Sequence, residues 1–299
     1  MTKPKSANIV HAMRPSFLIL TPVCILLAVA TAQFQGLHYS LAYALLCLVG
    51  ALTAHIAVNT LNEYQDFHSG LDLMTERTDF SGGSGLLVQH PHLSAQVFKA
   101  SLIALAITAI VGIYFITIHG WKILPIGLLG LLVVITYTKW INKQAWLCLI
   151  APGLGFGTFM VTGTYLCITG AINTSIWLIS LIPFFLINNL LLVNQIPDID
   201  ADTQVGRNHL AIKHGIGASI KAYGIFTIFA QLTLIYLVLT NILPLASIVA
   251  IIPMLLGYFV LYGMIRLNRD IASAPKYLAA NVICSIASPT LLALSLFFA

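Results

Sequence analysis

The chain has 299 residues, of which 59% are hydrophobic and 8% are charged, and its formal net charge is +5. With a mean hydropathy of +0.95, this composition excludes an ordinary soluble domain, in which about a quarter of the residues are charged. The class that remains is a polytopic helical membrane protein. Membrane orientation and contact with anionic lipid account for the positive charge, so we expect the lipid bilayer as a partner and no nucleic acid.

Nine apolar segments follow one another along the chain, and each is long enough to span a bilayer, which takes about 20 residues. They cover residues 15–35, 39–61, 94–118, 121–138, 146–170, 174–195, 217–240, 242–265 and 276–298. The first segment contains Ala30-Thr31-Ala32, which is similar to a signal-peptidase site, but the apolar run is long enough to be a retained span. We therefore expect an all-α protein with about nine transmembrane helices.

The charged residues predict the orientation of these spans. If Lys3, Lys5 and Arg14 are cytoplasmic, every other basic residue except Lys122 falls on the same side. The acidic residues fall there too, and they are Glu63, Asp66, Asp72, Glu76, Asp79, Asp198, Asp200, Asp202 and Asp270. This positive-inside pattern predicts a bacterial inner-membrane protein with its N-terminus and its charged site in the cytoplasm and its C-terminus on the opposite side.

One polar pattern occurs twice, each time where an apolar segment ends. The first copy is Asn62-Glu63-Tyr64-Gln65-Asp66 followed by Asp72, and the second is Asn194-Gln195-Ile196-Pro197-Asp198 followed by Asp202. In each copy the Asn and the first Asp are four residues apart, so their side chains share a helix face. Ionisable groups at membrane helices are costly and are functional by default.

The two copies are 132 residues apart and are separated by four predicted spans, so both lie at the same membrane face. We expect a single membrane domain, residues 1–299, made of two pseudo-repeats at 15–138 and 146–265 and a last helix at 276–298. A site at the interface of internal repeats is typical of such proteins.

Local geometry shapes each copy further. Gly70 is expected to end the first helix and to turn Asp72 back toward Asp66. Pro197 is expected to kink a continuing second helix, which would place Asn194, Asp198 and Asp202 on one stripe. The glycine-rich run Ser81-Gly82-Gly83-Ser84-Gly85 is a weak signal for phosphate binding through backbone amides.

Four carboxylates and two amides with basic residues on the same face favour one class of ligand. Hard oxygen donors favour Mg²⁺, which binds through a few carboxylates and the phosphates of a substrate. A diphosphate would bridge the two copies, and the apolar surroundings predict a hydrocarbon for the rest of the ligand. The candidate cations are Arg77, Lys139, Arg207 and Lys213.

The paired motifs, which span both halves, resemble those of the UbiA superfamily of intramembrane aromatic prenyltransferases. The six-residue gap to Asp72, the run Ser81-Gly82-Gly83-Ser84-Gly85 and the pattern Gly163-Thr164-Tyr165-x4-Gly170 resemble the 1,4-dihydroxy-2-naphthoate polyprenyltransferase branch. Two positions depart from the family pattern: Glu63 stands where Asp is common, and Gln195 stands where the branch usually has Asn.

This resemblance implies nine helices around a central cavity and Mg²⁺-dependent transfer of a polyprenyl group from its diphosphate to an aromatic ring in quinone biosynthesis. It implies catalytic and metal-binding roles for Asp66, Asp72, Asp198 and Asp202, assisted by Asn62 and Asn194. Arg77, Lys139, Arg207 and Lys213 would bind the diphosphate. Tyr64 and Tyr137 could stabilise an allylic cation through their ring faces, although interfacial tyrosines are more often belt residues.

Other functions remain open at this point. The acceptor could be 4-hydroxybenzoate or another phenol. A cation-coupled transporter would also explain paired acids and a repeat, but the outer halves of the spans carry almost no charge. A phospholipid head-group transferase would share the metal, but its dense Asp-Gly-x2-Ala-Arg run is absent.

Overall fold

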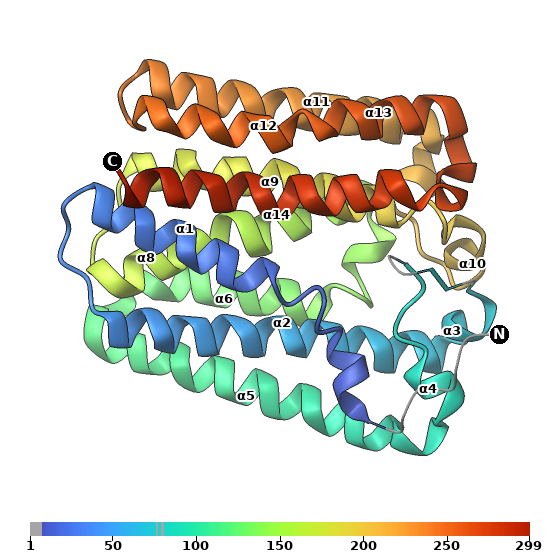
Figure 1. Ribbon diagram of the computed structural model, residues 1–299. Helices are drawn as coiled ribbons and strands as arrows, with labels where there is room; N and C mark the ends of the chain where they lie inside the picture. The colour runs from blue at the N-terminus through green and yellow to red at the C-terminus, as the bar shows by residue number, and fades with distance from the viewer. Residues whose placement is uncertain (1–7, 76, 79–80) are drawn as a thin grey trace.

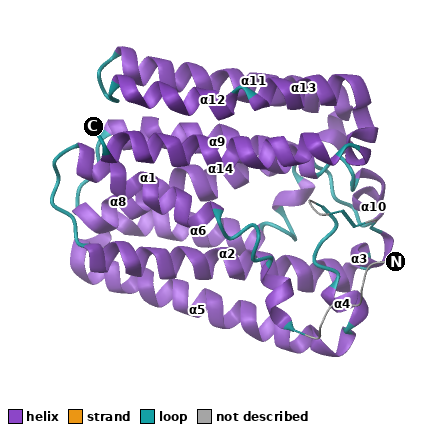
Figure 2. Ribbon diagram, in the orientation of Figure 1, coloured by secondary structure: helices purple, strands orange, loops and turns teal. Residues whose placement is uncertain are grey.

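The computed structural model describes residues 8–75, 77–78 and 81–299, and this part of the chain folds into helices and loops without a strand (Figure 2). Lys3, Lys5, Glu76 and Asp79, which entered the charge argument, lie outside the described residues. The longer helices are α1 (Leu20–Phe34), α2 (Leu41–Ser69), α5 (Ser94–His119), α6 (Leu124–Thr136), α9 (Thr174–Asn194), α11 (Leu210–Leu239), α13 (Leu256–Leu267) and α14 (Pro275–Phe297). The shorter ones are α3 (Leu71–Met74), α4 (Leu86–Gln89), α7 (Ala145–Pro152), α8 (Val161–Thr169), α10 (Ile199–Gln204) and α12 (Ile251–Met254).

Seven helical segments of the described chain are long and apolar enough to cross a membrane. Two features account for the difference from the nine predicted spans. Gly120, at φ +71°, separates α5 from α6 inside one continuous apolar segment, Pro91–Thr136. Helix α1 has 15 residues, fewer than the ~20 that a bilayer span takes. The all-helical membrane class is confirmed, and the count of nine stays a prediction.

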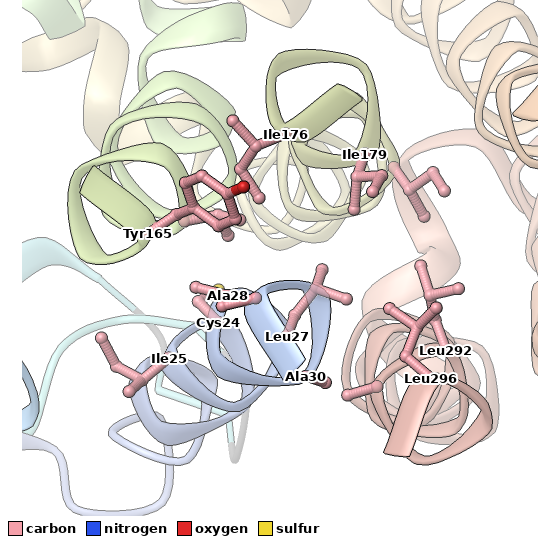
Figure 3. Close-up of a cluster of buried hydrophobic side chains, with 14 of the residues drawn as sticks. Cys24, Ile25, Leu27, Ala28, Ala30, Tyr165, Ile176, Ile179, Leu292 and Leu296 are labelled. Atoms are coloured by element: carbon pink, nitrogen blue, oxygen red, sulfur yellow. The ribbon is translucent and has the colours of Figure 1, made fainter. Parts of the chain in front are cut away.

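The long helices run side by side, with α11 and α13 forming one edge, α9 and α14 the middle, and α2 and α5 the other edge (Figure 1). Small residues allow close approach: a Cβ on Gly50 of α2 would lie 2.9 Å from Val111 of α5. In the main core, Leu27 of α1 is fully buried with Ile179 and Leu292 of α9 and α14 (Figure 3). Because lipid is as apolar as these side chains, such helices associate through tight van der Waals fit.

Buried polar bonds join α9 to α11 and α14. The Asn189 amide donates to Tyr223 O at 3.1 Å and to Thr227 Oγ1 at 3.0 Å. The Tyr223 hydroxyl donates to Asn281 Oδ1 at 2.9 Å, and Asn281 Nδ2 donates back to Asn189 O at 3.1 Å. These bonds fix the register of α9, the helix that carries the second polar motif at its end.

The two motifs end their helices differently. Helix α2 continues to Ser69 and stops at Gly70, whose φ of +81° confirms the expected break. Helix α9 stops at Asn194, and a turn leads to Asp198, the N-cap of α10. The prediction of a kinked helix continuing through Pro197 is therefore wrong, because the chain leaves the helical path before the proline and restarts one turn later.

Candidate active site

A cavity of about 630 Å³ lies within the helix bundle. Its wall is mostly apolar and includes Phe115, Ile126 and Leu190. Its polar lining comes from both motifs, namely Asn62, Asp66, Asp72, Asn194, Asp198 and Asp202. The short helices α3 and α10, which follow the two motifs, contact each other at one end of the bundle (Figure 1). The fold thus brings together residues that are 132 positions apart in sequence.

The first motif presents its polar groups from α2 and α3. Asn62 and Asp66 are one turn apart on α2 and both line the cavity. The turn at Gly70 brings Asp72 back to the same cavity, where its side chain is buried and its Oδ2 has no hydrogen-bond partner in the part of the chain that the structure describes. Glu63 does not line the cavity, because its carboxylate accepts hydrogen bonds from Ser84.

The second motif presents its groups from the turn between α9 and α10. Asn194 is the last residue of α9, and its Oδ1 is buried without a partner. Asp198 stands at the N-cap position of α10 without a side-chain capping bond, and its buried Oδ1 has no partner among the described residues. Asp202 lies one turn further along, with its N–H donating to Asp198 O at 2.8 Å.

Arg207 connects the two motifs. Its Nη1 donates to Asp202 Oδ1 at 2.9 Å, and its Nη2 donates to Asp66 Oδ1. His209 Nε2 lies 3.1 Å from the other oxygen of Asp202. Burial opposes the charge on Arg207, but the neighbouring Asp66 and Asp202 carboxylates outweigh it and raise the pKa of the guanidinium. Arg207 therefore remains charged and joins the two halves of the site.

The carboxyl groups of Asp72 and Asp198 have raised pKa values. Burial, with the nearby Glu63 and Asp66 carboxylates, raises the pKa of Asp72 to about 7. Burial, with Asp202, likewise raises the pKa of Asp198 to about 7, although the Gly82 backbone N–H opposes the shift. Burial disfavours the charged form unless an opposite charge compensates, so both groups are short of positive charge.

The donor set fits a Mg²⁺ ion with a phosphate ligand. Asp72 Oδ2, Asn194 Oδ1 and Asp198 Oδ1 are buried hard oxygens without partners, and carboxylate and amide oxygens suit Mg²⁺. Among the described residues, no three His, Cys, Asp or Glu side chains form a complete metal site.

The predicted basic residues are placed unequally. Arg207 lines the cavity, whereas Arg77 is exposed and donates from Nη2 to Asp72 O at 2.8 Å. Lys139 and Lys213 are exposed and do not line the cavity. Lys139 and Lys213 were predicted to lie near the motifs because they share the same membrane face. Their actual positions depend on how the helices pack, which the distribution of charges along the sequence does not show.

The lining of the cavity also includes Arg14, His55 and Tyr137, which sequence reasoning left out of the site. Arg14 lies 3.8 Å from Glu63. His55 is two turns before Asn62 on α2, and its Nδ1 lies 2.9 Å from Thr21 Oγ1. Its spacing from Asn62 was the one available signal. Tyr64, by contrast, stacks on His68 and Phe98 and does not line the cavity.

Comparison with known proteins agrees with this arrangement. Residues 19–283 match the model of the UbiA prenyltransferase family. The chain belongs to the UbiA prenyltransferase family. The predicted family and the predicted enzyme class, a prenyltransferase embedded in a membrane, are confirmed, and the transporter and head-group transferase alternatives lose their support.

Two curated relatives that share one name are similar to this chain. The chain is 28% identical over 230 residues to 1,4-dihydroxy-2-naphthoate octaprenyltransferase of Bacillus subtilis (strain 168), an alignment that covers 76% of this chain and 72% of that protein. It is 27% identical over 209 residues to the enzyme of the same name from Escherichia coli (strain K12), covering 69% of this chain and 68% of that one.

Solved UbiA structures share the fold. A UbiA homologue from Aeropyrum pernix K1 in its apo form superposes with a TM-score of 0.72 at 17% identity, covering 97% of this chain and 98% of that chain. A homologue from Archaeoglobus fulgidus bound to GPP and Mg²⁺ superposes with a TM-score of 0.67 at 16% identity, covering 98% and 100%.

Proposed function

We propose that this protein transfers a polyprenyl group from polyprenyl diphosphate to 1,4-dihydroxy-2-naphthoate in quinone biosynthesis. The observation that carries the proposal is a cavity whose polar lining comes from both motifs while its wall is apolar. Such a cavity suits a ligand with a charged head and a hydrocarbon tail. The curated relatives named 1,4-dihydroxy-2-naphthoate octaprenyltransferase support the choice of acceptor.

Mg²⁺ would be held by Asp66, Asp72, Asp198 and Asp202, with Asn62 and Asn194 assisting. When bound, it supplies positive charge that stabilises the leaving diphosphate. The A. fulgidus homologue bound to GPP and Mg²⁺ supports the choice of Mg²⁺ as the ion. Mg²⁺ also suits the unpartnered oxygens of Asp72, Asn194 and Asp198.

The protein's own residues supply the rest of the catalysis. Arg207, with Arg77 beside Asp72, is proposed to bind the diphosphate as the allylic C–O bond breaks and negative charge develops on the leaving group. Lys139 and Lys213 would act from the exterior by attracting the anionic substrate. The apolar wall excludes water, which would otherwise capture the allylic cation. The face of Tyr137 is available to stabilise that cation.

The aromatic acceptor then reacts with the allylic cation. The ring carbon that bears the carboxylate forms a bond to the allylic carbon. Carbon dioxide leaves, and the electrons of its bond to the ring restore the aromatic system. The products are the prenylated quinol, carbon dioxide and diphosphate. With 4-hydroxybenzoate, the second candidate acceptor, the carboxylate stays in the product.

The setting proposed for this reaction is the cytoplasmic face of a bacterial inner membrane, with the C-terminus on the opposite side and with two pseudo-repeats in a single domain. The positive-inside pattern supports the orientation, and the meeting of the two motifs at one end of the bundle supports the repeat.

The test uses membranes that contain the protein, Mg²⁺, a labelled polyprenyl diphosphate and either 1,4-dihydroxy-2-naphthoate or 4-hydroxybenzoate. Asp66→Asn and Asp198→Asn are the inactive variants. Asp200→Asn is the matched control, since the Asp200 side chain is 84% exposed and forms an ion pair with Arg269 at the surface. The proposal expects a lipid product with the naphthoate that is lost only in the first two variants. A product with 4-hydroxybenzoate alone would reject the acceptor assignment.

A further inference from the structure

Glu63, which departs from the family pattern, is fully buried next to the site without lining the cavity. Its Oε2 accepts a hydrogen bond from Ser84 N–H at 2.9 Å, and its Oε1 accepts one from Ser84 Oγ at 2.5 Å. Ser84 Oγ in turn accepts from Leu86 N–H at 3.1 Å at the start of α4. A side chain of α2 is therefore bonded to the glycine-rich segment 81–85 through Ser84, which is 21 residues away in sequence.

The segment that Glu63 holds contacts both motifs. Gly83, at φ +72°, lies so close to the first motif that an added Cβ would be 3.0 Å from Asp72 Oδ1. The Gly82 backbone N–H lies close enough to the Asp198 carboxylate of the second motif to lower the pKa of that carboxyl. Ser81, Gly82 and Gly83 also line the cavity itself. Backbone, with no intervening side chain, thus lies next to carboxylates from both halves.

The basic residues around this segment depend on the same contact. Arg14 Nη2 would lie 3.5 Å from a Cβ on Gly83, and it is 3.8 Å from Glu63 Oε2. On the other side of the segment, a Cβ on Gly85 would lie 2.6 Å from Arg77 Nε. A shift of the segment would therefore move two cations and two carboxylates together.

We propose that Glu63 is a positioning residue, which fixes segment 81–85 through Ser84 so that Asp72 and Asp198 are held ready to receive the Mg²⁺–diphosphate group. This inference rests on the proposed function for the identity of the ligand. Glu63 acts through Ser84 and touches no reacting atom. Its length is part of the role, because Asp at this position is shorter by one methylene, about one C–C bond of 1.5 Å, and would not reach Ser84.

The experiment compares Glu63→Gln, Glu63→Asp, Ser84→Ala and the double variant Glu63→Gln/Ser84→Ala, with Asp200→Asn as the control. Binding of geranylgeranyl diphosphate with Mg²⁺ to purified protein is measured by titration calorimetry, and KM for each substrate and kcat are measured alongside. We expect each single variant to bind the diphosphate about tenfold more weakly, the size of a lost hydrogen bond to a charged group. KM for the acceptor should stay unchanged.

The double variant distinguishes positioning from a general structural effect. If Glu63 acts through Ser84, the loss of affinity in the double variant is smaller than the product of the two single losses, because both changes affect the same Ser84 Oγ–Glu63 hydrogen bond. Multiplying effects would overturn the inference, as would unchanged binding in Ser84→Ala. If Glu63→Asp binds as tightly as the parent protein while Glu63→Gln does not, charge alone matters and the inference is wrong.

The design also keeps the two proposals apart. Diphosphate binding requires no acceptor, so the positioning of segment 81–85 is tested even if the naphthoate gives no product. Should the Glu63 variants fail to fold, Ser84→Ala still decides, since it removes the Ser84 Oγ–Glu63 Oε1 hydrogen bond and leaves the Glu63 carboxylate and the Ser84 N–H in place.

Discussion

Replacing Arg207 with Met tests whether the carboxylates of Asp66 and Asp202 need a cation between them. The Arg207 side chain is 15% exposed, and those of its partners Asp66 and Asp202 are 8% and 2% exposed. Breaking a buried ion pair by removing one partner costs about 3–5 kcal/mol, because the remaining charge is buried without compensation. At roughly 2–4 °C per kcal/mol for a large domain, the melting temperature should fall by about 6–20 °C.

The assay is thermal unfolding of the detergent-purified protein, with EDTA and with millimolar Mg²⁺. The loss should be full in EDTA and should shrink in Mg²⁺, because the metal ion can replace the guanidinium between the two carboxylates. The matched control is Arg269→Met, which breaks the pair with Asp200 at 2.9 Å on the surface. The Arg269 side chain is 59% exposed, so we expect a loss of at most about 1 kcal/mol. An Arg207 variant as stable as the control, or a loss that Mg²⁺ does not reduce, would refute the reasoning.

Three further predictions concern the site and its support. Burial raises the pKa values of Asp72 and Asp198 to about 7. Since metal binding requires the ionised carboxylates, the apparent Mg²⁺ affinity should rise about 10- to 100-fold between about pH 6 and pH 8. Mg²⁺ titration of activity measures this rise, and an affinity that does not change with pH would contradict the prediction. Gly83→Ala puts a methyl group 3.0 Å from Asp72 Oδ1 at a backbone φ of +72°, so diphosphate KM should rise with little change in kcat, whereas Gly36→Ala, at φ +66° with open space around it, should leave KM unchanged. Asn189→Leu removes two buried bonds to α11 and should cost about 1–3 kcal/mol in thermal unfolding with substrate KM unchanged; a changed KM with intact stability would argue against a purely structural role.

Much of the fold could be predicted because its signals are local. Hydropathy places the long helices, and the left-handed glycine at position 70 ends α2 where the sequence indicates. The even number of predicted spans between the two Asn-x3-Asp motifs predicts their meeting at one end of the bundle, which the packing of α3 against α10 shows. The ends of helices are harder to predict from sequence. Pro197 is compatible with a kinked helix and also with a turn, and in the structure α9 stops at Asn194 and a turn positions Asp198.

The site was less predictable because it depends on tertiary contacts. Arg14 precedes the first helix and reaches the cavity only through the packing of the N-terminal segment against α2. Lys139 and Lys213 share the membrane face of the motifs but are exposed. The partner of Glu63 is Ser84 in a loop 21 residues away, and no pattern in the sequence connects them.

The most direct test of the proposed reaction follows the acceptor's carboxylate. Purified protein is given Mg²⁺, a polyprenyl diphosphate and 1,4-dihydroxy-2-naphthoate labelled in its carboxyl carbon, and released carbon dioxide is counted against prenylated product. The proposed reaction predicts equimolar release, which Asp66→Asn and Asp198→Asn abolish. A prenylated product that retains the label, or no product while 4-hydroxybenzoate is prenylated, would contradict it.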